Sequence, residues 1–142
     1  MIVGAFLGFW SSVVATLLTK RWEVRVQNRR EIFFAYLPEA RLAVGHPDDV
    51  EALRASDRLV RACLLAGDDE GRLARKMAEL GGEWRYFRGQ AHDERHAAAV
   101  RDDYAAKAVT ASNQYNDVAD ALQESVAASI QRPTWLERLL LP

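Results

Sequence analysis

The chain has 142 residues, of which 49% are hydrophobic and 27% are charged, a composition typical of one folded domain and not of a disordered chain. The formal net charge of −1 argues against a dedicated nucleic-acid binder, because such proteins usually carry a clear basic excess. Arginine heavily outnumbers lysine and alanine is abundant, which suggests a bacterial protein. Cys63 has no second cysteine to pair with, so we expect a small buried hydrophobic residue and not a disulfide.

The N-terminal segment, residues 1–19, contains no charged side chain and predicts a single transmembrane helix. Its residues would rise about 28 Å as a helix, close to the hydrocarbon thickness of about 30 Å. A cleaved signal peptide is one alternative, but its basic residues would precede the apolar stretch and a small-residue cleavage site would follow it. A buried core helix is the other alternative, and it would usually show a polar edge. We therefore expect an uncleaved signal-anchor over residues 1–20.

Basic residues follow this segment directly and predict its orientation. We call them the basic collar: Lys20, Arg21, Arg25, Arg29 and Arg30. The positive-inside rule places them in the cytoplasm and the N-terminus outside the inner membrane. Trp22 falls at headgroup level, where an indole is half apolar and half hydrated. The collar is expected to bind anionic lipid headgroups, so the bilayer is the first expected partner.

Small residues recur every fourth position along the predicted span, at Gly4, Gly8, Ser12 and Thr16. Such a ridge lets two membrane helices approach closely, because packing drives their association in lipid. The spacing therefore predicts a homo-oligomer, although small residues are also common in membrane helices that do not associate.

The juxtamembrane residues 21–42 are expected to continue the membrane helix as one rod. No glycine or proline interrupts residues 9–37, and Pro38 is the expected stop or kink. A loop is expected over residues 43–47, within a cytoplasmic helical bundle that covers residues 43–132.

Two shorter helices are expected next in the bundle. One begins at Asp48 or Asp49, ends near Ala66, and has its expected apolar side at Val50, Leu53, Val60, Cys63 and Leu64. After a turn at residues 67–69, another helix carries Leu73, Met77 and Leu80. Gly81 and Gly82 are expected to weaken or break it, ahead of an aromatic group formed by Trp84, Tyr86 and Phe87.

Residues 90–132 contain no glycine or proline and predict one long helix. Heptad spacing connects Val100, Tyr104, Ala108, Ala111, Tyr115, Val118, Leu122 and Ser125. We expect an antiparallel bundle with one coiled-coil-like helix, and an intermolecular coiled coil is the alternative. The amphipathic tail, residues 133–142, is expected either to lie at the lipid interface or to close the bundle core. The fold class is thus all-α.

His92 and His96 form the motif that most resembles a chemical site. Within one helix their spacing would place both imidazoles on one face, as a metal requires. Asp93 stands where the zincin pattern has glutamate, and no third histidine follows at metzincin spacing. The alternative is a solvated helix start without metal, and we expect no cofactor.

The expected function is a membrane-anchored helical scaffold or interaction protein, not an enzyme. It would be homo-oligomeric and would recruit a cytoplasmic protein, with no nucleic-acid partner. One alternative is an effector or pore-forming subunit whose cytoplasmic bundle senses a signal. The other is a metal-dependent enzyme that uses His92 and His96.

Overall fold

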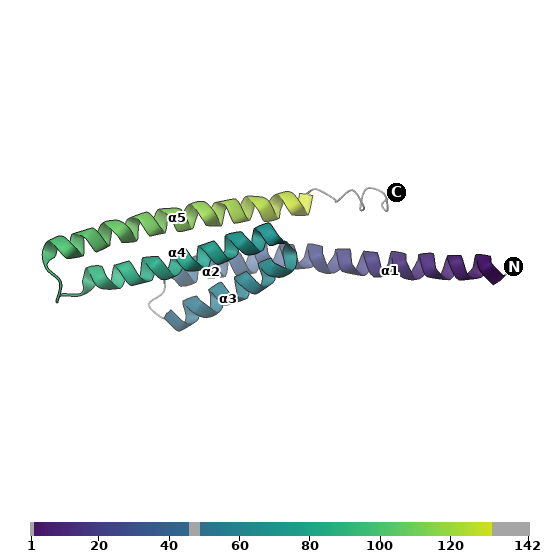
Figure 1. The fold of residues 1–142 in the computed structure, drawn as a ribbon, viewed down its shortest axis with the longest axis horizontal. Helices are drawn as coiled ribbons and strands as arrows, with labels where there is room; N and C mark the ends of the chain where they lie inside the picture. The colour runs from purple at the N-terminus through teal and green to yellow at the C-terminus, as the bar shows by residue number, and fades with distance from the viewer. Residues whose placement is uncertain (1, 46–48, 132–142) are drawn as a thin grey trace.

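The computed structural model describes residues 2–45 and 49–131, with side chains for residues 12–45 and 50–130. Every regular element in these ranges is helical, so the expected all-α class is confirmed for them (Figure 1). The elements are α1 (Ile2–Glu31), a π-helical turn η1 (Ile32–Tyr36), α2 (Leu37–Val44), α3 (Asp49–Ala66), α4 (Asp68–His92) and α5 (Ala98–Gln131).

The helices form a bundle from which α1 projects. Figure 1 shows α4 and α5 as a long antiparallel hairpin, with α3 packed beside α4 and the N-terminal part of α1 extending beyond the end of the bundle; α2 packs mainly against α3. The largest fully buried side chains of the bundle come from several different elements: Ile32, Leu37, Leu59, Cys63, Met77, Leu80, Leu122 and Val126. The expected helical bundle is therefore confirmed.

The rod beyond residue 31 does not stop at Pro38. The backbone N–H of Leu37 donates to the carbonyl of Ile32, five residues earlier, and Pro38 lies in the first turn of α2. Proline has no N–H, and in a regular helix its ring would clash with the carbonyl four residues before it. The π-helical turn widens the helix just ahead of that ring, so the helical path continues to Val44.

The apolar side predicted for α3 is largely wrong. Val50, Leu53 and Leu64 are exposed, whereas Cys63 is buried as expected. The buried stripe consists mainly of small residues: Ala52, Ala55, Leu59, Ala62, Cys63 and Ala66. Alanine side chains let α3 approach its neighbours closely, and this close approach outweighs the burial of larger residues on the other face.

The break predicted at Gly81 and Gly82 is also wrong, because α4 runs through both residues to His92. Gly81 instead marks a close approach of helices. A Cβ atom built there would lie 3.2 Å from Val44 Cγ2 and 3.4 Å from the Tyr115 ring. The same tyrosine donates a hydrogen bond from its hydroxyl to the carbonyl of Ala40, at 3.1 Å. The absence of a side chain at Gly81 thus allows Val44 of α2 and Tyr115 of α5 to pack closely against α4.

The long C-terminal helix begins later than predicted, at Ala98 and not at residue 90. Residues 93–97 form the turn between α4 and α5, where an Asp93 carboxylate oxygen accepts the backbone N–H of Arg95 at 3.0 Å. The heptad pattern does mark the inner side of α5. Its buried members are Ala108, Ala111, Tyr115 and Leu122. Val100, at the start of α5, is exposed instead.

Among the residues that the structure describes, none of the helices combines the length and the apolar character that crossing a membrane requires. The transmembrane part of the expected fold is therefore not supported by the structure. The side chains of residues 1–11, the first half of the predicted span, lie outside the described ones, and the tail over residues 133–142 lies outside the described residues altogether.

Candidate membrane-proximal site

The site lies where α1 leaves the bundle. Two side chains fasten α1 there: Asn28 Nδ2 donates to the carbonyl of Ala62 on α3 at 3.0 Å, and Arg29 Nη1 donates to the carbonyl of Ser129 on α5 at 3.4 Å. One turn further on, Ile32 is fully buried in the core. On the N-terminal side of Asn28, most of the described side chains of α1 are exposed.

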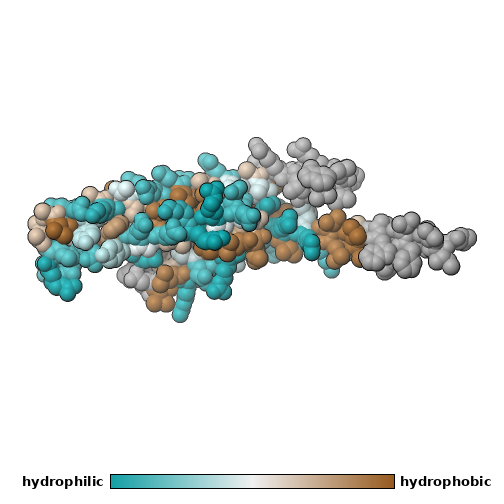
Figure 2. Space-filling model, viewed as in Figure 1, coloured by the Kyte–Doolittle hydropathy of each residue, from teal (hydrophilic) through white to brown (hydrophobic). Residues whose placement is uncertain are grey.

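Apolar side chains are exposed on this projecting part of α1. Val14, Leu17 and Leu18 are 47%, 56% and 37% exposed, and Trp22 is 36% exposed. Figure 2 shows a brown band on α1 just beyond the bundle, whose own surface is mostly teal. An apolar band next to basic side chains is the pattern of a segment that meets a lipid surface.

Four of the five collar residues are exposed, and Arg29 is half-buried. Lys20, Arg21 and Arg25 are exposed and, within the described part of the chain, form no ion pair. Arg30 is exposed as well and borders a shallow apolar groove between η1 and the end of α5. Arg29 differs from the prediction, because its guanidinium faces α5 and holds α1 to the bundle.

A groove runs along the free part of α1 beside Lys20, Arg21 and Arg25. It has a volume of about 600 Å³ and is lined by Leu17, Lys20, Arg21, Val24, Arg25, Gln27, Asn28, Glu31 and Leu65. All lining residues except Leu65 belong to α1. The α3 helix ends at Ala66, and the chain reverses direction at Gly67. Leu65, near the end of α3, therefore forms one side of the groove, and α1 forms the rest.

The predicted packing ridge is described only in its second half. The hydroxyl of Thr16 donates to the carbonyl of Ser12 at 2.8 Å, and that of Thr19 donates to the carbonyl of Ala15 at 2.9 Å. Both hydroxyls thus donate their proton to a carbonyl one turn earlier in the same helix. Ser12 and Thr16 are exposed, whereas Gly4 and Gly8 lie outside the described side chains.

The structure separates His92 from His96. His92 is the last residue of α4, whereas His96 lies in the following turn, where its Nε2 pairs with Gln90 Oε1 at 2.8 Å. The two imidazoles therefore do not share a helix face, and the geometry expected for a metal is wrong. In the ranges with described side chains, no group of three or more histidine, cysteine or acidic residues is arranged to hold a metal ion.

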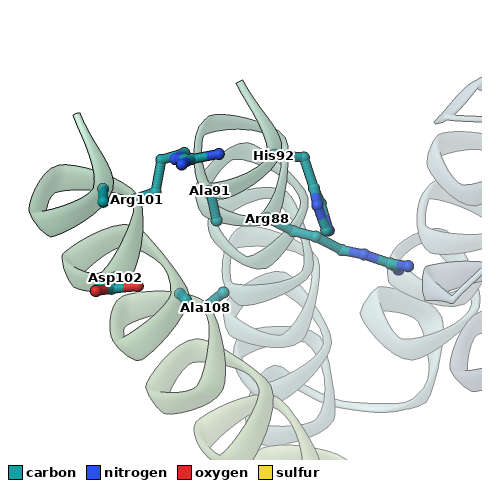
Figure 3. A pocket seen from close by; sticks show the side chains of 8 residues that line it. Arg88, Ala91, His92, Arg101, Asp102 and Ala108 are labelled. Carbon is teal, nitrogen blue, oxygen red and sulfur yellow. The ribbon is translucent and has the colours of Figure 1, made fainter. Parts of the chain in front are cut away.

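A second groove lies at the far tip of the bundle, between α4 and α5 (Figure 3). Its lining includes His92, Arg88, Arg101 and Asp102. Figure 3 shows Arg101 lying towards Ala91, whereas His92 and Arg88 point away on the other side of α4. Arg88 is held over the Trp84 ring, 5.0 Å from its centroid. The polar groups do not converge on one point, so this groove is a poor site for chemistry.

Cys63 is also unsuited to chemistry. It is fully buried, and burial, followed by the negative charge of Glu70, raises the pKa of its thiol to about 12. The thiolate is therefore scarce at neutral pH, and the sequence-based expectation of a buried hydrophobic residue is confirmed.

Comparison with known protein families, with curated proteins and with solved structures finds no match for this chain. Sequence reasoning identified the collar but missed Asn28 and Leu65, which complete the groove. Only the packing of α3 against α1 brings them together.

Proposed function

We propose that the chain is a bacterial, single-pass membrane-anchored interaction module. Residues 1–19 insert in the bilayer, and the bundle lies in the cytoplasm and recruits a protein partner. The observation that carries this proposal is the way in which the uncharged N-terminal segment extends away from the bundle, with the exposed part of the collar at the junction (Figure 1). Exposure of apolar side chains to water is unfavourable, and a lipid bilayer would bury them. Its anionic headgroups would also bind the neighbouring cations.

The anchoring proposal is tested by extraction of membranes with alkaline carbonate. We expect the full chain to stay in the membrane pellet, because a spanning helix is not released when electrostatic contacts are broken. A surface-bound protein held by Lys20, Arg21 and Arg25 alone would be released. Complete release of the chain would therefore contradict a spanning anchor.

We also propose that the module self-associates through the ridge of Gly4, Gly8, Ser12 and Thr16. Replacing both glycines by leucine is expected to lower the yield of crosslinked dimer at least about fivefold, because the larger side chains keep the helices apart. The measurement is crosslinking in native membranes followed by gel electrophoresis.

The matched control for this experiment replaces Leu17 and Leu18 by alanine, outside the ridge. Dimer yield is expected to stay close to that of the unchanged chain. Equal yields for the glycine variant and the unchanged chain would remove the ridge as an interface.

A further inference from the structure

The groove beside α1 is lined by exposed apolar side chains and by exposed cations. Its apolar side chains are well exposed: Leu65 is 77% exposed, Val24 67% and Leu17 56%. Its cations, Lys20, Arg21 and Arg25, form no ion pair among the described residues. A concave surface with apolar and cationic parts is complementary to a molecule that is itself apolar at one end and anionic at the other.

The order of these groups along α1 gives the occupant a direction. Leu17 lies within the predicted span at one end of the groove, and Arg21 and Arg25 follow at intervals of one helical turn, about 6 Å each. Glu31 lies at the opposite end, where its carboxylate accepts a hydrogen bond from Gln27 at 3.3 Å. The anionic part of the occupant therefore belongs near Lys20, Arg21 and Arg25 and away from Glu31, and its apolar part belongs against the apolar side chains of the groove.

We propose that this groove binds one anionic phospholipid per chain. Its phosphate lies among Lys20, Arg21 and Arg25, and an acyl chain lies along Leu17, Val24 and Leu65. The proposal rests on the membrane location proposed above and adds to it a specific, stoichiometric lipid site. Arginine suits such a site, because its guanidinium presents several N–H donors to phosphate oxygens.

Leu65 distinguishes this site from general attraction to a charged surface. It comes from α3, so its part of the apolar wall depends on the packing of α3 against α1, which includes the hydrogen bond from Asn28 to Ala62. A diffuse electrostatic interaction would depend on the net charge of the collar and not on one uncharged side chain of another helix.

The experiment is native mass spectrometry of the full chain in mild detergent, with dioleoyl-phosphatidylglycerol and dioleoyl-phosphatidylcholine added at equal concentrations. We expect one phosphatidylglycerol retained per chain in preference to phosphatidylcholine. The double variant R21Q/R25Q is expected to reduce the lipid-bound fraction at least about fivefold. Leu65→Ser, which changes no charge, is expected to reduce it by a similar factor.

Two controls match these variants outside the groove. Arg30→Gln removes a collar charge that borders a different groove, and Leu53→Ser removes an exposed leucine of α3. Both are expected to retain the lipid, and circular dichroism checks that every variant is folded.

The outcomes separate this inference from the proposed function. Equal loss with Arg30→Gln and R21Q/R25Q, or no loss with Leu65→Ser, would overturn a specific site in favour of general electrostatics. Absence of retained phosphatidylglycerol from a chain that resists carbonate extraction would overturn the lipid site alone. Release of the chain by carbonate would overturn the membrane anchor itself.

Discussion

Replacing Leu122 by alanine is expected to lower the free energy of unfolding of the bundle by about 3 kcal/mol. Leu122 lies on the inner side of α5 and is fully buried. It belongs to the core cluster that also contains Ile32, Met77 and Tyr115, so its removal leaves a cavity at the contact of several helices. Urea unfolding of the full chain in mild detergent, followed by the helical circular-dichroism signal at 222 nm, measures the change.

The matched control is Leu53→Ala on α3. Leu53 is 58% exposed, although the sequence predicted it on the apolar side of its helix. We expect a loss of no more than about 0.5 kcal/mol, because little apolar surface returns to water. Equal losses for the two variants would contradict the described orientation of α3.

The helical content and the inner side of α5 could be predicted because they depend on local pattern. Heptad spacing placed Ala108, Ala111, Tyr115 and Leu122 correctly on the buried side. The orientation of α3 could not be predicted in the same way. Its larger residues Val50, Leu53 and Leu64 favour one face, while close packing through alanines favours another, and only the neighbouring helices decide between them.

The special residues were harder to interpret, because each has more than one structural use. Pro38 stops many helices, but here a π-helical turn precedes it and the helix continues. Gly81 breaks many helices, but here it accommodates Val44 and Tyr115. The misplaced start of α5 had the largest functional consequence, since it created an apparent pair of imidazoles from His92 and His96.

Only the part of the candidate site that lies within one short segment of the chain could be predicted from the sequence. The collar lies within one short segment of the sequence, and four of its five cations are exposed as expected. The inward orientation of Arg29 and the contribution of Leu65 depend on contacts with α5 and α3. Such contacts join residues far apart in the chain, so no local pattern reports them.

Replacing Val14 by arginine is expected to lower the carbonate-resistant fraction of the chain at least about tenfold. Val14 is 47% exposed on the projecting part of α1, away from the bundle, so the substitution leaves the core untouched. A charge near the centre of a membrane helix costs about 2.5–3.5 kcal/mol, and every 1.4 kcal/mol corresponds to about a tenfold change in an equilibrium. Val14 lies nearer the end of the predicted span, so we expect the lower part of that range.

Val24→Arg is the control, because Val24 is 67% exposed on the same helix but lies beyond the predicted span. An added charge there joins the collar and is expected to leave the carbonate-resistant fraction unchanged. Val14→Leu, which keeps the segment apolar, is expected to behave like the unchanged chain. If Val14→Arg also stayed in the carbonate-resistant pellet, insertion of residues 1–19 would not be what holds the chain in the membrane, and the proposed anchor would be wrong.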